Sequence, residues 1–375
     1  LLDPNNGFIS PTGTIQLLIK FTIKSDTESH VSLIQPDIQY LSYETAAPEQ
    51  PESKPTADHV ETPEKPQKYA GLINQGATCY MNSMLQAFFH CPPFRQIVYN
   101  IPTTGNEDNP EKSIPLNLQR LFCSMQLSKG EACSTEALTK SFGWSRQEIM
   151  VQHDAEEFCR VLMDNLEEKL KGYEELENAI QELFQGKSRR AIRCKRVDYQ
   201  NFTEDKFLDI PLDVKGVHSL QESFAKYVEK EEMEGNNQII TDEYGKQDAT
   251  MNVEFIEFPP ILHLHLQRFV YDFSSGSLTF TKLNDYFEFP EQIDLTPYLA
   301  EDSPSRQKSN LYDLYGVLVH SGSINSGHYN AYLRTSTDKQ WYFFNDSQVT
   351  PVSSKKAIQS NFGYREAQKQ PMKTV

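Results

Sequence analysis

The sequence predicts an α+β fold, in which helices form the first part of the main domain and a mostly antiparallel sheet forms the second. Two patterns lead to this fold class. Between residues 79 and 170, apolar side chains recur at helical spacing in three segments. From residue 192 onward, apolar and polar residues alternate with the period of two that a half-buried strand requires. Runs of helices followed by runs of strands are typical of α+β domains.

A strand and a linker precede this domain. Residues 12–24 predict a strand with one buried face, because five apolar residues alternate there: Ile15, Leu17, Ile19, Phe21 and Ile23. Residues 44–68 contain prolines at five positions and almost no large apolar side chain, so burial cannot offset the entropy lost on ordering them. We interpret residues 31–68 as a proline-rich, acidic linker and expect the main domain to begin near Tyr69.

Three helices are expected in the first half of the domain. The first covers residues 79–89 and ends before the prolines at 92 and 93. Its apolar stripe consists of Met81, Met84, Leu85, Phe88 and Phe89. A second helix is expected over residues 115–127, and a third opens at Asp154 and ends at Gly172. The apolar stripe of the third consists of Phe158, Val161, Leu162, Leu166 and Leu170.

The residue pattern in the second half of the domain predicts strands that are separated by turns. Residues 261–269 alternate apolar and polar side chains, and further strands are expected over residues 314–320, 329–333 and 341–344. Serine and glycine mark turns at residues 274–276 and 326–327. A cleft between the helical half and the sheet half would bring residues of both halves together.

Composition excludes several classes of function. The chain of 375 residues has a net charge of −16, so nucleic acids and anionic membranes are poor partners, and a partner with a basic face is expected. No apolar run is long enough to cross a bilayer. The six cysteines form no C-x-x-C pair, which argues against a zinc cage and fits a reducing, intracellular compartment. Four of them are expected to be small, partly buried side chains: Cys91, Cys123, Cys133 and Cys159.

Cys79 differs from these four because it stands where the first predicted helix begins. The unpaired backbone amides and the positive end of the helix dipole favour the thiolate, which is the form that attacks carbon. Hydrolysis of an amide also needs a base, a group that orients the base, and a donor for the oxyanion. His328 can act as the base, Asn345 or Asp346 can orient it, and Asn74 can point its amide at the oxyanion.

The motifs around these residues resemble those of the ubiquitin-specific proteases. Residues 71–83, GLINQGATCYMNS, look like the cysteine box of that family, and residues 327–329 (GHY) with 341–346 (WYFFND) look like its histidine box. Residues 152–154 (QHD) and 264–269 (LHLQRF) resemble intermediate motifs of the family. Together these motifs are specific, and the resemblance covers most of the chain after residue 69.

The resemblance implies a papain-like cysteine peptidase architecture with a helical thumb and a mostly antiparallel palm and fingers. The catalytic domain would cover residues 69–365, followed by a tail at 366–375. It would cleave the peptide or isopeptide bond after the C-terminal glycine of ubiquitin through an acyl-enzyme. Cys79 would be the nucleophile and His328 the base. Asn345 would be the third member and Asn74 the oxyanion donor, while Asp346 would supply charge to the imidazole or support the oxyanion site.

The resemblance also implies residues that contact ubiquitin. Asp154 and Glu157 would bind arginines in its C-terminal tail, with Gln152 beside them. Phe269 and Tyr329 would wall the slot that takes the two terminal glycines. Other interpretations stay open. Asp154 and Glu157 also fit the ends of a helix capping box, and the two aromatic residues also fit ordinary sheet packing.

The implied partners are ubiquitin and ubiquitinated proteins, with no cofactor, and the implied location is the nucleus, the cytoplasm or both. Residues 1–30 resemble the last part of a TRAF-like β-sandwich, which would recruit substrate adaptors in a longer chain. Many family members bind zinc in the fingers through two C-x-x-C pairs. Here Cys194 stands alone, so we expect fingers that strand pairing alone holds together, and no metal site.

Four alternatives compete with parts of this interpretation. The chain could be a catalytically silent scaffold that binds ubiquitin, although every catalytic position is filled. It could be a papain-like protease of general proteins, although the C-G-[SA]-C-[WY] signature is missing around Cys79. Finally, His263 and His265 could bind a metal, although they alternate with leucines on the polar face of a strand, and His320 could be a second base.

Overall fold

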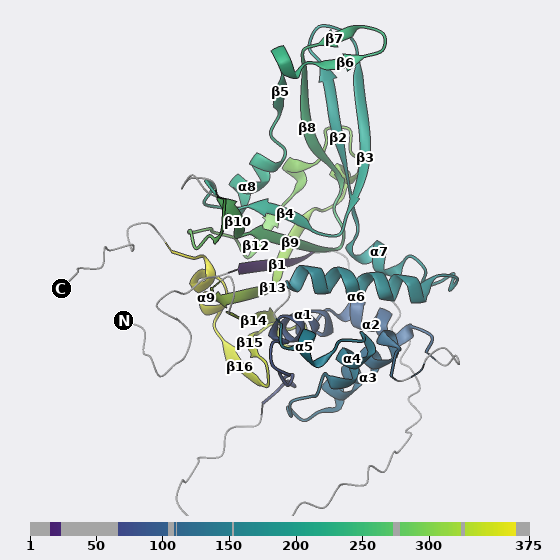
Figure 1. The fold of residues 1–375 in the computed structure, drawn as a ribbon, viewed down its shortest axis with the longest axis vertical. Coiled ribbons are helices and arrows are strands. Elements are labelled where there is room, and N and C mark those ends of the chain that lie inside the picture. Colours follow the sequence, from purple (N-terminus) through teal and green to yellow (C-terminus); the bar gives the residue numbers. More distant parts are fainter. Residues whose placement is uncertain are drawn as a thin grey trace, which may run out of the picture. The chain divides into compact units, whose positions relative to one another are not determined.

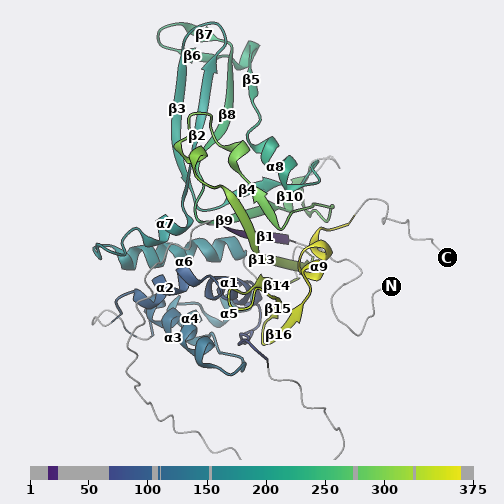
Figure 2. The same ribbon diagram turned by 180° about the vertical axis from the view of Figure 1, so that it is seen from behind.

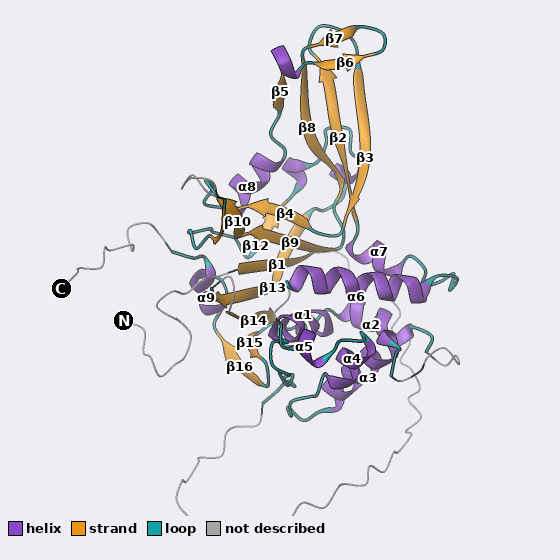
Figure 3. Ribbon diagram, viewed as in Figure 1, coloured by secondary structure: helices purple, strands orange, loops and turns teal. Residues whose placement is uncertain are grey.

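The computed structural model describes residues 16–23, 67–103, 109, 111–151, 154–272, 278–323 and 327–364, which belong to one compact unit. Residues 25–66 form a second unit, which lies outside the described residues and includes nearly all of the predicted linker. In the first unit, helices gather on one side of a large sheet, and a long narrow sheet extends from the other side (Figure 1, Figure 2). The segregation of helices from strands confirms the α+β class (Figure 3).

The first half of the domain is helical, as the apolar spacing predicts. Its helices are α1 (Cys79–Phe89), α2 (Pro92–Asn100), α3 (Ile114–Leu127), α4 (Glu136–Ser141), α5 (Arg146–Ile149), α6 (Ala155–Leu170) and α7 (Ala179–Phe184). The prolines at 92 and 93 end α1 but also begin α2, because a proline at the first helical position loses no hydrogen bond. The sequence pattern indicates these prolines only as a helix stop, so α2 was not predicted.

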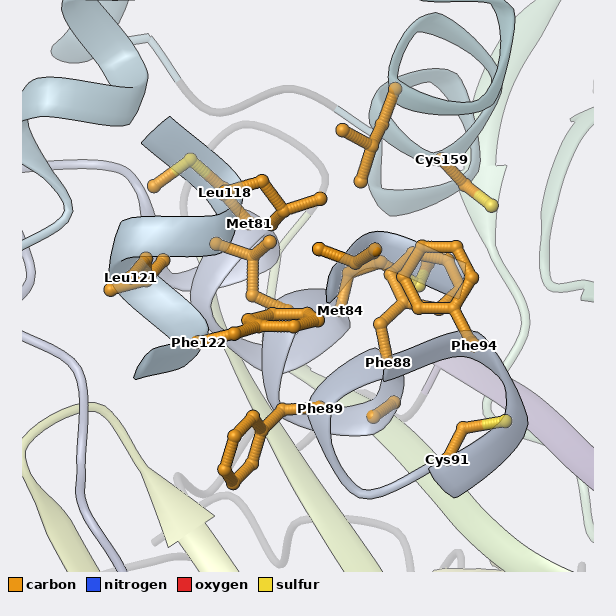
Figure 4. Packing of buried hydrophobic residues seen from close by; sticks show 14 of the residues in the cluster. Met81, Met84, Phe88, Phe89, Cys91, Phe94, Leu118, Leu121, Phe122 and Cys159 are labelled. Atoms are coloured by element: carbon orange, nitrogen blue, oxygen red, sulfur yellow. The ribbon is translucent and has the colours of Figure 1, made fainter. Parts of the chain in front are cut away.

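The helix α1 is the centre of the helical half. Its residues are buried on every side, so the apolar stripe that the sequence predicts is only part of the covered surface. Met81 lies beside Leu118 of α3, Phe89 packs on Phe122 of α3 at 5.4 Å, and Phe88 packs on Phe94 of α2 (Figure 4). The helix is therefore fixed between other helices and the sheet, and Cys79 at its first residue is fixed with it.

The large sheet packs on the side of α1 that faces away from α2 and α3. Its order is β16, β15, β14, β13, β1, β9 and β4, with β12 pairing along β13. The pairs are antiparallel except β4 with β9. The strands are β1 (Gln16–Ile23), β4 (Ile210–Asp213), β9 (Ile261–Gln267), β12 (Gln292–Asp294), β13 (Leu311–Gly322), β14 (Gly327–Arg334), β15 (Trp341–Asn345) and β16 (Gln348–Val352).

The strand predicted near the start of the chain is present as β1, between β13 and β9. Leu18 lies opposite Leu318 on β13 and His265 on β9. The expected TRAF-like origin of residues 1–30 stays a prediction, of which only residues 16–23 fall inside the described part.

Both faces of the large sheet are covered, which the sequence did not predict for β9. Leu318 faces the helices, whereas its neighbours Val317 and Val319 belong to a second core on the opposite face, beside α8 (Leu220–Tyr227) and α9 (Ser354–Ala357). The supposed polar face of β9 is therefore covered only in part, because His265 is half-buried and Gln267 is exposed. His263 is only 3% exposed and packs between Phe88 and Phe184.

The narrow sheet consists of β3 (Gln200–Phe207), β2 (Gly186–Cys194), β8 (Ala249–Glu257) and β5 (Glu231–Met233), in that order. A small hairpin of β6 (Ile239–Thr241) and β7 (Gly245–Gln247) lies at its tip (Figure 1). Ion pairs add to the strand pairing that we expected alone. Arg189 binds Glu254 at 2.8 Å and Asp302 at 2.6 Å, and Arg193 binds Glu254 at 2.6 Å.

A two-stranded arm of β10 (Phe269–Asp272) and β11 (Thr279–Lys282) follows β9 directly. Short 3-10 turns complete the fold at Gly235–Asn237, Thr296–Tyr298, Pro304–Gln307 and Gln359–Asn361. None of the helices in the described ranges combines the length and hydrophobicity that crossing a bilayer requires.

Two side-chain predictions are corrected by the fold. Val161 of α6 is 40% exposed, and the buried face of this helix instead includes Cys159 and Met163, because the helix lies rotated toward α7 and β9. Cys123 is exposed on α3, whereas Cys91, Cys133 and Cys159 are buried as expected.

Candidate active site

Cys79 is the first residue of α1, as the turn signals before it predict. Asn74 shapes that turn, because its Oδ1 accepts hydrogen bonds from the N–H of Gly76 at 2.9 Å and from the N–H of Thr78 at 3.2 Å. The thiol is almost completely buried at 2% exposure. The backbone N–H of Tyr329 on β14 donates to Cys79 Sγ at 3.3 Å. The sulfur is therefore in direct contact with the strand that carries the candidate base.

His328 follows Gly327 at the start of β14 and faces Cys79. The hydrogen bond with Cys79 is the main cause that raises the pKa of His328 to about 9. Burial opposes this shift, and Asn345 and Asp346 add to it. His328 Nε2–H donates to Asn345 Oδ1 at 2.6 Å, so Nδ1 is the nitrogen left for the sulfur. The imidazole therefore lies between the thiol and an amide, as the sequence predicts.

Asp346 lies one residue after Asn345 and is held by two amides. Its Oδ2 accepts from Asn74 Nδ2 at 2.9 Å, and its Oδ1 accepts from Asn82 Nδ2 at 2.8 Å. The same Oδ2 lies 3.7 Å from His328 Nε2. The Asp346 carboxylate thus bonds the Asn74 amide and also lies near the imidazole of His328, while its two expected roles stay predictions.

The turn at Asp346 is tied to the segment before Cys79. Asp346 adopts a left-handed backbone with φ 49°, which Asp tolerates better than most residues, and its carbonyl accepts from the N–H of Leu72 at 2.8 Å. The backbone of Ser347 passes so close to Gly71 that a Cβ there would lie 2.3 Å from its carbonyl oxygen. Glycine at position 71 therefore permits the two ends of the domain to meet.

Asn82 lies in the site although its sequence pattern did not predict a role there. It is 2% exposed, and its amide bonds the Asp346 carboxylate. The available signal was its position three residues after Cys79, one helical turn along the same face. That signal is weak without knowledge of Asp346, because an asparagine there also fits a helix surface.

The described residues that we expect to contact ubiquitin come from the start of α6, from β14 and from β10. Asp154 is the N-cap of α6 and accepts from the N–H of Glu156 at 2.8 Å, while Glu157 is exposed in the first turn. Tyr329 is buried, and burial, followed by the charge of Asp154, raises its pKa well above the usual range. Phe269 is half-buried at the start of β10. Gln152 lies outside the described residues.

His320, the alternative base, lies beside the site but is engaged elsewhere. Its Nδ1 accepts from Lys282 Nζ at 2.6 Å. Burial, followed by the charges of Lys282 and His328, lowers the pKa of His320 to about 3. Its ring packs at 4.6 Å from that of Tyr329. A neutral imidazole that already accepts a hydrogen bond is a poor base.

The alternative metal site at His263 and His265 finds no support in the described ranges. There, no group of three or more His, Cys, Asp or Glu residues is placed to hold an ion. His263, half of the H-x-H pair, instead has Cys159 Sγ 4.0 Å from its Nδ1.

A buried cysteine at a helix start, an imidazole from a sheet and an amide behind it define a class of cysteine hydrolases. The family model described as ubiquitin carboxyl-terminal hydrolase matches residues 70–369, and the chain belongs to this family.

Curated relatives support the same assignment. The chain is 46% identical to ubiquitin C-terminal hydrolase 12 of Arabidopsis thaliana over 302 residues, 80% of this chain and 26% of that protein. It is 45% identical to ubiquitin carboxyl-terminal hydrolase 15 of Saccharomyces cerevisiae, over 79% of this chain and 24% of that protein. It is 44% identical to ubiquitin carboxyl-terminal hydrolase 7 of Drosophila melanogaster, over 79% of this chain and 25% of that protein. The chain thus matches about a quarter of each relative's length.

A solved structure shares the fold. The SAGA DUB module that contains Ubp8 and is bound to monoubiquitin matches with a TM-score of 0.68 and 25% identity, covering 80% of this chain and 69% of the other. The thumb, palm and fingers that the sequence resemblance implies therefore correspond to the helical half, the large sheet and the narrow sheet.

Proposed function

We propose that this domain is a deubiquitinating thiol hydrolase, which cleaves the peptide or isopeptide bond after the C-terminal glycine of ubiquitin. The observation that carries the proposal is the chain of contacts from Cys79 through His328 to Asn345, in a member of the ubiquitin carboxyl-terminal hydrolase family. Ubiquitin and ubiquitinated proteins are its partners.

In the proposed first step, the Cys79 sulfur attacks the carbonyl carbon of the terminal glycine. The carbonyl oxygen gains negative charge, which the Asn74 amide and the backbone N–H of Cys79 stabilise. The imidazolium of His328 then donates its proton to the leaving amine, the carbon–nitrogen bond breaks, and a thioester remains on Cys79. The raised pKa of His328 keeps that proton available at neutral pH.

In the second step, a water molecule attacks the carbonyl carbon of the thioester, and the imidazole of His328 takes a proton from that water. The carbon–sulfur bond breaks, ubiquitin leaves with a free carboxylate, and the thiol is restored. Asn345 holds the imidazole in one tautomer throughout. Asp346 positions Asn74 and stabilises the imidazolium, and Asn82 holds Asp346 in place.

Five residues are proposed to bind the C-terminal tail of ubiquitin: Gln152, Asp154, Glu157, Phe269 and Tyr329. The carboxylates of Asp154 and Glu157 at the start of α6 suit a basic tail, although Asp154 also caps the helix. Tyr329 lies directly after His328 and next to the sulfur, so its ring can border the slot for the terminal glycines.

The finer identity is also a proposal. Residues 141–144 (SFGW), 152–154 (QHD) and 287–292 (FEFPEQ) resemble the herpesvirus-associated ubiquitin-specific protease most. On this view residues 1–30 end a TRAF-like domain that recruits substrate adaptors, and the protein works in the nucleus, the cytoplasm or both. Imaging of the full-length protein in cells and adaptor capture with and without its N-terminal domain test these points.

The central test replaces the nucleophile. Cys79→Ala should lower release of a fluorescent group from the ubiquitin C-terminus by more than about 1,000-fold, because no acyl-enzyme forms. Cys123→Ala, which removes an exposed thiol on α3, is the matched control and should keep full activity. Equal turnover by Cys79→Ala would end the proposal.

The two alternatives give different outcomes in the same assay. A silent scaffold would bind ubiquitin but leave both the reporter and a ubiquitin-based thiol probe unreacted. A general papain-like protease would cut a plain peptide reporter as well as the ubiquitin reporter. The proposed function expects rapid labelling of Cys79 by the probe and little cleavage of the plain peptide.

A further inference from the structure

Lys282, the last residue of β11, is a buried lysine beside the candidate site. It is 9% exposed, and its Nζ donates to three acceptors: His320 Nδ1 at 2.6 Å, the carbonyl of His320 at 3.1 Å and the carbonyl of Gly322 at 3.1 Å. A lysine ammonium has three N–H donors, and here three acceptors surround it. None of the three acceptors is a carboxylate, so this is not an ordinary ion pair.

The three acceptors lie at the end of β13, directly across from the residues that carry the candidate chemistry. In the register of the two strands, His320 pairs with Tyr329, Ser321 with His328, and Gly322 with Gly327. Ser321 of β13 is the residue that pairs with His328. Lys282 therefore holds β13 at the residues directly before and after Ser321.

The His320 ring extends this hold across to β14. It packs at 4.6 Å from the Tyr329 ring, and a Cβ on Gly327 would lie 2.0 Å from His320 Nε2. The ring thus rests against the residues immediately before and after His328. The N–H of Tyr329, which donates to Cys79 Sγ, belongs to the same segment.

Lys282 is itself fixed by its neighbours. Arg268 donates to the carbonyls of Leu283 and Asp285 at 3.2 and 2.9 Å, and the N–H of Leu283 donates back to the carbonyl of Arg268 at 2.6 Å. The Nζ also lies 5.3 Å from the centre of the Phe269 ring. The amino group is consequently presented from a rigid position.

Burying this amino group is costly, which argues that it is there for placement rather than for stability. Burial, followed by the charge of Arg268, lowers the pKa of Lys282 to about 7. An apolar side chain of similar length would fill the volume without that penalty. Only the lysine satisfies the carbonyls and the imidazole at once.

We propose that Lys282 is a positioning residue for the reaction, whose amino group fixes the end of β13 and thereby the place of His328 relative to Cys79. The inference rests on the proposed roles of Cys79 and His328. The Lys282 amino group acts through His320 and Gly322, and it touches neither the Cys79 sulfur nor the reacting bond.

The test compares Lys282→Met with Lys282→Arg in the full chain, using steady-state turnover of a ubiquitin reporter. Lys282→Met keeps the length of the side chain but removes every donor. We expect kcat to fall about 10- to 100-fold while KM stays within about twofold, because the reacting groups lose alignment but ubiquitin still binds. Lys282→Arg retains donors and should recover part of kcat. Lys356→Met, an exposed lysine on α9, is the control and should match wild type.

A second readout separates positioning from general damage. The rate of Cys79 alkylation by chloroacetamide at neutral pH depends on the imidazole beside the sulfur, so Lys282→Met should slow it. The melting temperature should stay the same or rise. An unchanged kcat and alkylation rate would overturn the proposal, and so would a rise in KM alone or an arginine variant no better than methionine.

If Lys282→Met does not fold, His320→Phe tests the same contact. This variant keeps a ring against Gly327 but removes the acceptor Nδ1, and the proposal expects a loss of kcat at constant KM. An unaltered kcat in His320→Phe would then refute it. A wild-type protein that leaves the ubiquitin reporter uncut would instead refute the proposed function.

Discussion

His328 has different neighbours on its two ring nitrogens. Nε2 donates to Asn345, which can accept but carries no charge, and the thiol of Cys79 faces the other side of the ring. Among the described contacts of this ring, the Asp346 carboxylate lies 3.7 Å from Nε2. The hydrogen bond with Cys79 is the main contact that favours the imidazolium, Asp346 adds to it, and the Asn345 amide sets the orientation of the ring.

This arrangement predicts how pH limits activity. The pKa of His328 is raised to about 9, so the imidazolium persists below that pH and is lost as the pH rises through it. Because Asn345 helps to raise the pKa, Asn345→Ala should move the alkaline limit of kcat/KM to lower pH and reduce turnover about 10- to 100-fold.

The control is Thr350→Ala, which changes an exposed position on β16. The pH dependence of its kcat/KM should coincide with that of wild type. An alkaline limit that does not move in Asn345→Ala would show that the amide has no part in holding the proton.

The sequence predicted those site residues that stand in local patterns. Cys79 follows a turn and begins an apolar stripe, and His328 lies in a short motif before a strand, so both could be selected. Asn82 and Lys282 could not, because a buried amide or lysine is recognised by its partners. Those partners, Asp346 and His320, lie far away in the sequence and meet them only in the folded domain.

At the scale of elements, the narrow sheet depends on ion pairs between its strands. Glu254 of β8 is shared by Arg189 and Arg193 of β2, and Phe202 of β3 covers Arg189 at 4.2 Å. Burial would raise the pKa of Glu254, but the two arginines outweigh it and lower the pKa below the usual value. The carboxylate is therefore stabilising when charged.

Two glutamates of β8 make a matched comparison. Glu254→Gln should lower the free energy of unfolding by about 2 kcal/mol, because two charge-assisted hydrogen bonds in a partly covered site are lost. Glu257→Gln, whose lysine partners are more exposed, should cost less than about 1 kcal/mol. Urea unfolding at neutral pH measures both.

The pH dependence of this contribution has a definite sign. Since the folded-state pKa of Glu254 is lowered, its stabilisation is present above the ordinary value near 4.5 and is lost as the pH falls through the folded-state value. Equal losses for the two glutamine variants would contradict a special role for Glu254.

Periodicity placed α1, α3, α6, β1, β9, β13, β14 and β15, but it did not place the strands of the narrow sheet or the shorter helices. A period reports which side chains are apolar, not which faces other elements cover. Val161 looked like a core residue although α6 turns it toward solvent, and His263 looked solvent-exposed although helices cover β9. The second helix α2 was missed because prolines serve equally at a helix end and a helix start.

At the scale of the whole molecule, charge favours a basic partner. The net charge of −16 should speed the approach of such a partner at low salt. If ubiquitin is bound through its basic tail, kcat/KM for the ubiquitin reporter should fall severalfold as sodium chloride is raised, with kcat within about twofold.

Alkylation of Cys79 by an uncharged thiol reagent provides the control, because no long-range attraction acts on it and salt should leave it unchanged. A kcat/KM that does not vary with salt would argue against electrostatic steering of the partner.

The hydrogen bond from Leu72 to Asp346 has a consequence for how the protein is made. A ribosome synthesises the thiol-bearing helix long before the turn that secures the base, so a growing chain carries a cysteine without its imidazole and carboxylate. Reactivity would then arise only when translation has passed the last strands. A polypeptide that is released early would be inert rather than an unregulated hydrolase.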